Sequence, residues 1–303
     1  MVRFRLVATD LDGTLLDSRG EISPRVKAAV TRLVERGITV ALTTSRRYVG
    51  TAPVAEALGI AGPLILYDGA LVRHYPSADI FLHRPLASDV VRRTVDIMAH
   101  NGLRPIVQGS GANGESLLVP DSPAHSMYDG DFLRGYAHQV QMVELERLHT
   151  LATEPLRVVA FGPKDVLEPI KSLLMRLPVG VQLLPLGSYG TAELTVFSPS
   201  ASKGAALAAV ASARNIPMRE VFAIGDSVND VSMLRVAGMA VAMENGHPAA
   251  QAAAHALAPS NDADGLAEAV ERFVLDEDVK VPARRHGDAN DESRHAGGTT
   301  LAE

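Results

Sequence analysis

The stretch Asp10-Leu11-Asp12-Gly13-Thr14-Leu15-Leu16 constrains the fold most strongly, because it closely follows the apolar run Leu6-Val7-Ala8. In a strand, Asp10 and Asp12 point to the same side, since side chains alternate between the two faces. Gly13 permits a tight turn, and Thr14 offers a hydroxyl group. Ionised carboxylates at the end of a buried strand are costly unless a cation or hydrogen-bond donors satisfy them. The pattern suits one carboxylate attacking an electrophile while its neighbour moves a proton; a strand followed by an Asp-rich turn is the simpler alternative.

Composition bounds the class of protein. The 303 residues allow one large domain or two moderate ones, and a hydrophobic fraction of 47% supports a sizeable core. A net charge of −6 gives no sign of a nucleic-acid partner. The absence of Cys excludes disulfides, thiolate metal sites and cysteine catalysis. No apolar run approaches the roughly 20 residues that span a bilayer, and the N-terminal residues read as a strand instead of a signal peptide. We therefore expect no membrane association and a cytoplasmic protein.

Predicted strands and helices alternate at both ends of the chain. Ser23-Pro24 predicts the start of a helix that ends at Gly37. Strands are predicted at 38–42 and 63–67, with a helix between them. From Ser202 a helix, a strand at 221–224, a helix at 232–237, a short strand at 239–242 and helices at 248–255 and 264–275 follow. This alternation predicts an α/β fold with a parallel sheet covered by helices.

The middle of the chain has a different pattern. Strands are predicted at 80–82, 104–107, 116–119, 156–161, 181–184 and 193–197, helices at 88–99 and 166–177, and irregular structure at 120–150. Hairpins mixed with two helices predict an inserted α+β unit. The predicted domains are a core of residues 1–80 and 196–275, an inserted unit of residues 81–195, and a disordered tail of residues 276–303.

Polar clusters follow three of the predicted core strands. They are Asp10 with Asp12, Thr43 with Thr44, and Asp226 with Asp230. Parallel strands end at one edge of a sheet, and that edge is where open α/β sheets bind ligands. Carboxylates gathered there would repel one another without a divalent cation. Oxygen ligands, with no Cys and no His cluster, point to Mg²⁺ rather than zinc.

Four motifs in this order resemble those of the haloacid dehalogenase superfamily. They are Asp10-x-Asp12-Gly13-Thr14, Thr44, Lys203 and Gly225-Asp226-Ser227-x-Asn229-Asp230. The segment Ser260-Asn261-Asp262-x-Asp264-Gly265 is similar to the closing segment of the Cof-type branch, subclass IIB. The resemblance covers residues 4–275. It implies a Rossmann-like parallel-sheet core with an inserted α+β cap of the C2B type.

The resemblance also implies a role for each motif residue. Asp10 would be the nucleophile that forms an aspartyl-phosphate, and Asp12 the group that moves protons. Thr44 and Lys203 would hold the phosphoryl oxygens. The implied Mg²⁺ ligands are the carboxylates of Asp10 and Asp226, the main-chain carbonyl of Asp12, and Asp230 directly or through water, with Asn229 ordering the loop and Lys203. Taken singly, Lys203 would be an ordinary solvated lysine, Thr44 a helix cap, and Asp226 and Asp230 parts of a turn. The acidic residues Asp17, Asp121, Asp129 and Asp131 are expected at the surface.

Two positions depart from the branch pattern. Its second motif usually reads Thr-Gly-Arg, and here it is Thr44-Ser45-Arg46. Ser can follow the same backbone path unless that path needs a positive φ. The third strand usually ends in Asn-Gly-Ala, and here it ends in Asp68-Gly69-Ala70. Ser45, Arg46, Asp68 and Gly69 are expected near the substrate, where Asp68 would pair with Arg46 or select a substrate that carries a donor group.

The resemblance implies a Mg²⁺-dependent phosphatase that acts on a small phosphorylated metabolite such as a sugar phosphate, a nucleotide or pyridoxal phosphate. Residues 81–195 would form a lid, whose candidates for contacting substrate are Arg84, Arg104, Arg134, His138 and Arg157. A phosphomutase resembling phosphomannomutases is the main alternative, and a phosphate-sensing protein is another. The expected partner is a small phosphate ester, and the chain is expected to be a monomer or a homodimer.

Overall fold

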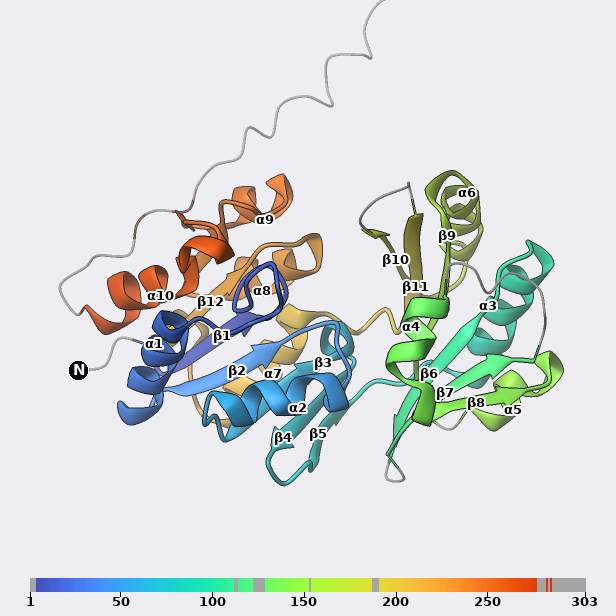
Figure 1. The fold of residues 1–303 in the computed structure, drawn as a ribbon, viewed down its shortest axis with the longest axis horizontal. Helices are drawn as coiled ribbons and strands as arrows, with labels where there is room; N and C mark the ends of the chain where they lie inside the picture. Colours follow the sequence, from blue (N-terminus) through green and yellow to red (C-terminus); the bar gives the residue numbers. More distant parts are fainter. Residues whose placement is uncertain are drawn as a thin grey trace, which may run out of the picture. The chain divides into compact units, whose positions relative to one another are not determined.

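The computed structural model describes residues 4–111, 114–121, 129–152, 154–186, 191–276, 282 and 284. The chain divides into two compact units. One consists of Met1–Ile38 and Pro217–Glu303, and the other of Thr39–Ile216. The two units are described here in turn (Figure 1).

The first unit contains four parallel strands in the order β14-β13-β12-β1. They are β1 (Leu6–Asp10), β12 (Val221–Gly225), β13 (Met239–Met243) and β14 (Ala256–Ala258). Every residue of β1, β12 and β13 is buried. Continuous apolar strands of this kind are typical of parallel sheets that are covered on both faces. The short strand β14 was not predicted, because its three residues carry no periodic signal.

Helices α1 (Pro24–Glu35), α8 (Val231–Val236), α9 (Pro248–Ala253) and α10 (Gly265–Val270) complete the first unit. The predicted start of α1 is confirmed, because the Ser23 side chain accepts a hydrogen bond from the Val26 amide at 3.1 Å and Pro24 takes the first helical position. The last predicted helix is α10 followed by a π-helical turn at Glu271–Leu275.

The second unit begins with the strands β2 (Thr39–Thr43), β3 (Gly62–Leu66), β4 (Leu71–Tyr75) and β5 (Ile80–His83). β2 and β3 are parallel, whereas β3, β4 and β5 form antiparallel pairs. Helices α2 (Tyr48–Ala57) and α7 (Lys203–Ala213) pack against β3, and a 3-10 turn at Tyr67–Gly69 follows that strand. β4 was not predicted. The strand predicted at 80–82 as part of the inserted unit pairs with β4 and so shares a sheet with β3.

The rest of the second unit is a six-stranded sheet of order β10-β11-β9-β6-β7-β8. Its strands are β6 (Ile106–Gly111), β7 (Gly114–Pro120), β8 (Val140–Val143), β9 (Pro155–Pro163), β10 (Gly180–Leu186) and β11 (Thr191–Phe197). All pairs are antiparallel except β7 with β8. Helices α3 (Ser88–His100) and α6 (Lys164–Leu174) pack against this sheet (Figure 1). This is the α+β unit that the sequence predicted.

The stretch 120–150 is less irregular than predicted. Its described residues include α4 (Gly130–Gly135), β8 and α5 (Leu148–Leu151). These elements are too short to leave a periodic pattern in the sequence. The predicted tail lies outside the described residues except for Asp276, Pro282 and Arg284.

No helix in the described part of the chain is both long enough and apolar enough to cross a membrane.

Candidate active site

Three carboxylates converge at the ends of two neighbouring strands in the first unit. Asp10 ends β1, and Asp226 and Asp230 follow β12, its parallel neighbour. One ligand oxygen from each of the three lies within 4.8 Å of the other two. Asp10 is 6% exposed and Asp230 is fully buried. The structure therefore brings together residues that lie more than two hundred positions apart in the sequence, as expected where parallel strands end at one edge. We call these three residues the carboxylate cluster.

The loop after β12 is shaped around Asp230. Its Oδ2 atom accepts hydrogen bonds from the backbone amides of Asp226 at 3.0 Å and Ser227 at 2.8 Å. Ser227 completes a capping box with Asp230. Thr14 donates its hydroxyl proton to Asp226 Oδ1 at 2.9 Å, which ties the loop after β1 to the loop after β12. Asp230 thus positions the loop that carries Asp226.

Two glycines allow the carboxylates to approach the backbone. A Cβ atom at Gly13 would lie 2.7 Å from Asp226 Oδ2, and one at Gly225 would lie 2.5 Å from Asp230 Cγ. Gly13 also has a φ of +80°, which residues with a side chain rarely adopt. The turn in the first motif therefore needs glycine for its backbone angle and for space.

The carboxylate cluster fits a hard divalent cation. Three like charges with little access to water repel one another, and a bound cation relieves both the repulsion and the desolvation. All three side chains offer oxygen ligands, which Mg²⁺ prefers. Asp12 is exposed, and its carboxylate is not part of the cluster of described residues. Its predicted contribution through the main-chain carbonyl stays a prediction.

In the second unit, Thr44 follows β2 and is 1% exposed. Its amide donates to Ile65 O at 2.8 Å, and its hydroxyl oxygen accepts a hydrogen bond from the Arg46 amide at 3.0 Å. Ser45 is not among the described non-glycine residues with positive φ. The replacement of glycine by Ser45 is therefore compatible with the backbone path, as the sequence predicted.

Asp68, Gly69 and Lys203 come from the end of β3 and the start of α7. Asp68 adopts a left-handed conformation with a φ of 55°, which Asn and Asp tolerate better than most residues. This tolerance explains how an acid can replace the usual amide there. A Cβ atom at Gly69 would lie 2.2 Å from Ser202 O, so only glycine fits against the first turn of α7. That turn carries Lys203, which is 1% exposed. A buried ammonium group at the positive end of a helix needs anionic partners.

Comparison with known proteins places this arrangement. Residues 7–270 match the family of haloacid dehalogenase-like hydrolases. This chain belongs to that family.

Relatives in the haloacid dehalogenase-like family resemble most of the chain. Phosphatase YwpJ of Bacillus subtilis (strain 168) is 29% identical over 293 residues, which cover 89% of this chain and 100% of that protein. HMP-PP phosphatase of Serratia proteamaculans (strain 568) is 28% identical over 245 residues, which cover 81% of this chain and 85% of that protein. The sequence-based assignment to a hydrolase of this superfamily is confirmed.

Solved structures of the family share the fold. A haloacid dehalogenase-like hydrolase from Bacteroides thetaiotaomicron is 27% identical, with a TM-score of 0.74 over 89% of this chain and 99% of that chain. A subclass IIB sugar phosphatase, 18% identical, covers 89% of this chain and 98% of that chain with a TM-score of 0.73. The predicted fold class, a Rossmann-like α/β core with an inserted α+β cap, is confirmed.

The predicted cap contacts have different surroundings in this hydrolase. Arg84 donates to Ser200 O, and His138 is exposed. Arg104 pairs with Asp129 at 3.4 Å and donates to Pro120 O at 3.1 Å, which gives it a structural role within the cap. Asp129 is 2% exposed, so its predicted surface position is wrong. Burial raises the pKa of Asp129, and the charge of Arg104 opposes that shift.

The sequence analysis missed Arg47 and Glu115. Arg47 immediately follows the second motif and is 1% exposed, and its Nε atom lies 3.9 Å from Glu115 Oε2. The side chain of Glu115 accepts a hydrogen bond from the Tyr67 hydroxyl at 2.9 Å. Their only signal in the sequence was the second arginine directly after Arg46, where a strand ends.

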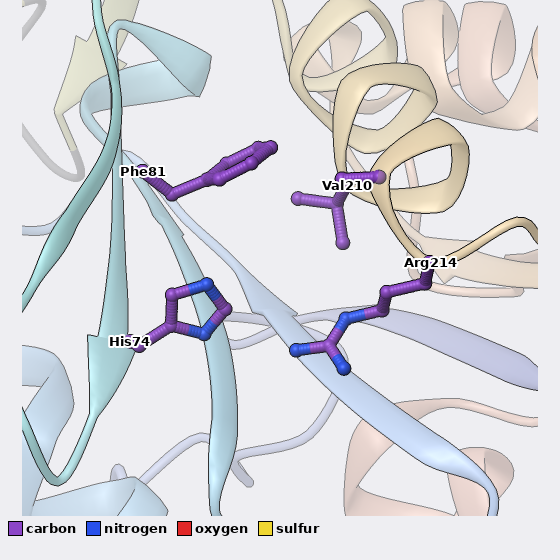
Figure 2. A pocket seen from close by; sticks show the side chains of 5 residues that line it. His74, Phe81, Val210 and Arg214 are labelled. Atoms are coloured by element: carbon purple, nitrogen blue, oxygen red, sulfur yellow. The ribbon is translucent and has the colours of Figure 1, made fainter.

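A small cavity of about 220 Å³ lies at the other end of α7. It is lined by His74, Phe81, Val210, Ala213 and Arg214, and Figure 2 shows the His74 ring and the Arg214 guanidinium group extending toward each other across it. Burial lowers the pKa of His74, and the charge of Arg214 lowers it further. None of the predicted site residues lines this cavity.

Proposed function

We propose that this chain is a Mg²⁺-dependent phosphatase that hydrolyses a small phosphorylated metabolite through an aspartyl-phosphate on Asp10. The observation that carries the proposal is the carboxylate cluster, in which the nucleophile named by the first motif shares a buried site with Asp226 and Asp230. Family membership and the named phosphatases among the relatives support the same chemistry.

In the proposed reaction, an Asp10 carboxylate oxygen attacks phosphorus and the bond between phosphorus and the ester oxygen breaks. Asp12 gives its proton to the leaving oxygen, so the alcohol departs neutral. Asp12 is exposed, which suits a group that then takes a proton from water. That water attacks phosphorus and releases inorganic phosphate, which restores Asp10.

The remaining residues position charge. Thr44 and Lys203 would hold the phosphoryl oxygens, with Ser45, Arg46, Asp68, Gly69 and Asn229 near the substrate. Asp10, Asp226, Asp230 and the main-chain carbonyl of Asp12 would hold Mg²⁺, which supplies neutralisation of the negative charge on the phosphoryl group. Residues 81–195 would act as a lid that excludes water and selects the leaving group.

The test is a phosphate-release assay with Mg²⁺ over sugar phosphates, nucleotides, pyridoxal phosphate and an aryl phosphate. We expect release that needs Mg²⁺ and falls at least about 10⁴-fold in Asp10→Asn, as loss of a nucleophile does in other hydrolases. In Asp12→Asn we expect phosphorylated protein to accumulate, detected by intact-protein mass spectrometry. Return of the phosphoryl group to another position of the substrate would instead identify a phosphomutase. A long-lived phosphorylated Asp10 in the wild type would identify a sensor.

A further inference from the structure

Arg47 is a buried cation that lacks hydrogen-bond partners. It is the N-cap residue of α2 and is 1% exposed. None of its three guanidinium nitrogens has a hydrogen-bond partner among the residues that the structure describes. The Tyr136 ring holds the guanidinium group at 4.8 Å from the ring centroid. Burying a guanidinium without acceptors is costly, so a group that supplies them would bind strongly here.

Glu115 lies beside Arg47 but is already occupied. Its Oε1 atom accepts hydrogen bonds from the Tyr48 amide at 2.8 Å and the Tyr67 hydroxyl at 2.9 Å. Its Oε2 atom accepts from the Val49 amide at 3.1 Å, and Arg47 Nε is 3.9 Å away, beyond hydrogen-bond range. Glu115 therefore balances the charge of Arg47 without satisfying its donors.

Glu115 also belongs to a polar strip on the cap sheet. Ser110 is its cross-strand partner, and Gln108, on the same face as Ser110, is paired across the sheet with Arg157. Arg157 is 7% exposed and donates from Nε to Gln108 Oε1 at 2.8 Å. Its guanidinium group lies 5.1 Å from the Tyr67 ring centroid. The same face farther along these strands is apolar, with Ile106, Val119, Val159 and Phe161.

Two further polar atoms in this strip lack partners. Gln108 Nε2 and Ser110 Oγ are fully buried and have no hydrogen-bond partner among the described residues. We call Arg47, Gln108, Ser110, Glu115 and Arg157 the Arg47 cluster. It contains two guanidinium groups and one carboxylate, so its net charge is positive.

We propose that the Arg47 cluster binds a second acidic group of the substrate, a carboxylate or a phosphate, at a distance from the ester that is cleaved. This inference rests on the proposed phosphatase function. A planar guanidinium fork matches the paired oxygens of a carboxylate or phosphate, and the orphan donors of Gln108 and Ser110 provide further hydrogen bonds. The substrate class is thus a phosphate monoester that carries a second anionic group.

The test compares esters that differ in one group. The pairs are phosphoglycerate with glycerol phosphate, and fructose bisphosphate with fructose monophosphate, so the first reports a carboxylate and the second a phosphate. The wild type should favour the doubly acidic member of at least one pair by about 10- to 100-fold in kcat/KM, the range for hydrogen bonds to charged groups. Arg47→Gln should lose this preference mainly through KM and leave the aryl phosphate unchanged.

Further variants separate binding from folding. Arg47→Lys keeps the charge but not the fork, so it should keep only part of the preference. Arg92→Gln on α3, at an arginine side chain that is 53% exposed, is the matched control and should change neither pair. Inhibition by phosphonopropionate compared with propylphosphonate measures binding without turnover, and thermal unfolding shows whether Arg47→Gln is folded.

The outcomes distinguish the two proposals. No phosphate release from any ester overturns the phosphatase function. Release without preference within either pair, or an equal loss for both members in Arg47→Gln, overturns the second acidic group while the phosphatase function stands. The latter result would mean that ordered water satisfies Arg47 and that its role is structural.

Discussion

The carboxylate cluster and the Arg47 cluster are opposites in charge and alike in what they lack. In the first, three carboxylates of one sign share a site that is mostly closed to water. In the second, a guanidinium group is buried with no acceptor for its donors among the described residues. Each arrangement is costly in the free protein, and each is relieved by a ligand of the opposite charge.

The two clusters differ in how the chain builds them. The carboxylate cluster comes from the ends of adjacent parallel strands, and glycines at positions 13 and 225 let it close. The Arg47 cluster joins the start of α2 to one face of the cap sheet through Glu115. The first is a family motif, and the second consists of residues that no motif names. The comparison suggests that reaction type and substrate choice are encoded separately, and three measurements can break or sharpen it.

Removing one carboxylate should have the largest effect. Mg²⁺ at a hundred times its Kd should stabilise the wild type by about 2.7 kcal/mol, because it binds only the folded state. Asp226→Asn should lose most of this gain, yet unfold at a higher temperature than the wild type without Mg²⁺, since one repulsive charge is gone. Calorimetric unfolding with and without Mg²⁺ measures both. Asp121→Asn, at an exposed position, is the control. An unchanged Mg²⁺ shift in Asp226→Asn would remove this residue from the metal site.

A glycine pair should show an intermediate effect. Gly13 and Gly20 have φ angles of +80° and +77°, but a Cβ atom would clash with Asp226 only at Gly13. Alanine at either position should cost about 1–2 kcal/mol of unfolding free energy from the backbone conformation. Gly13→Ala should in addition weaken Mg²⁺ binding, measured by titration calorimetry. Equal Mg²⁺ affinities in the two variants would show that the close approach to Asp226 is irrelevant to the metal.

A hydroxyl pair should show the smallest effect. Ser110 Oγ and Thr94 Oγ1 are both buried without a hydrogen-bond partner in the described structure, and Thr94 lies on α3, outside the Arg47 cluster. Ser110→Ala and Thr94→Val should each leave the unfolding free energy unchanged or raise it by about 1 kcal/mol, because an unsatisfied polar atom is removed. Only Ser110→Ala should raise KM for the doubly acidic ester. A similar rise in Thr94→Val would mean that the hydroxyl groups act on the cap as a whole.

Local signals were enough for much of the core. Ser23 and Pro24 predicted the start of α1, and the apolar runs predicted β1, β12 and β13, because caps and buried parallel strands depend on neighbouring residues. The meeting of Asp10 with Asp226 and Asp230 could also be predicted, since it follows from the shared edge of parallel strands.

Other features depended on contacts between distant residues. β4 and β14 were missed, and β5 was assigned to the inserted unit, because strand pairing is a long-range choice that a short apolar run does not specify. Asp129 was predicted at the surface and is buried beside Arg104.

By itself, the sequence determined the family, the motif residues and most elements of the core. These rest on spacing, capping and turn chemistry, which operate over a few residues. Only the tertiary structure decided that Arg47 is buried without acceptors and that Glu115 is occupied by the start of α2. Whether a charged side chain is solvated or desolvated depends on what packs around it, and those residues come from other parts of the chain.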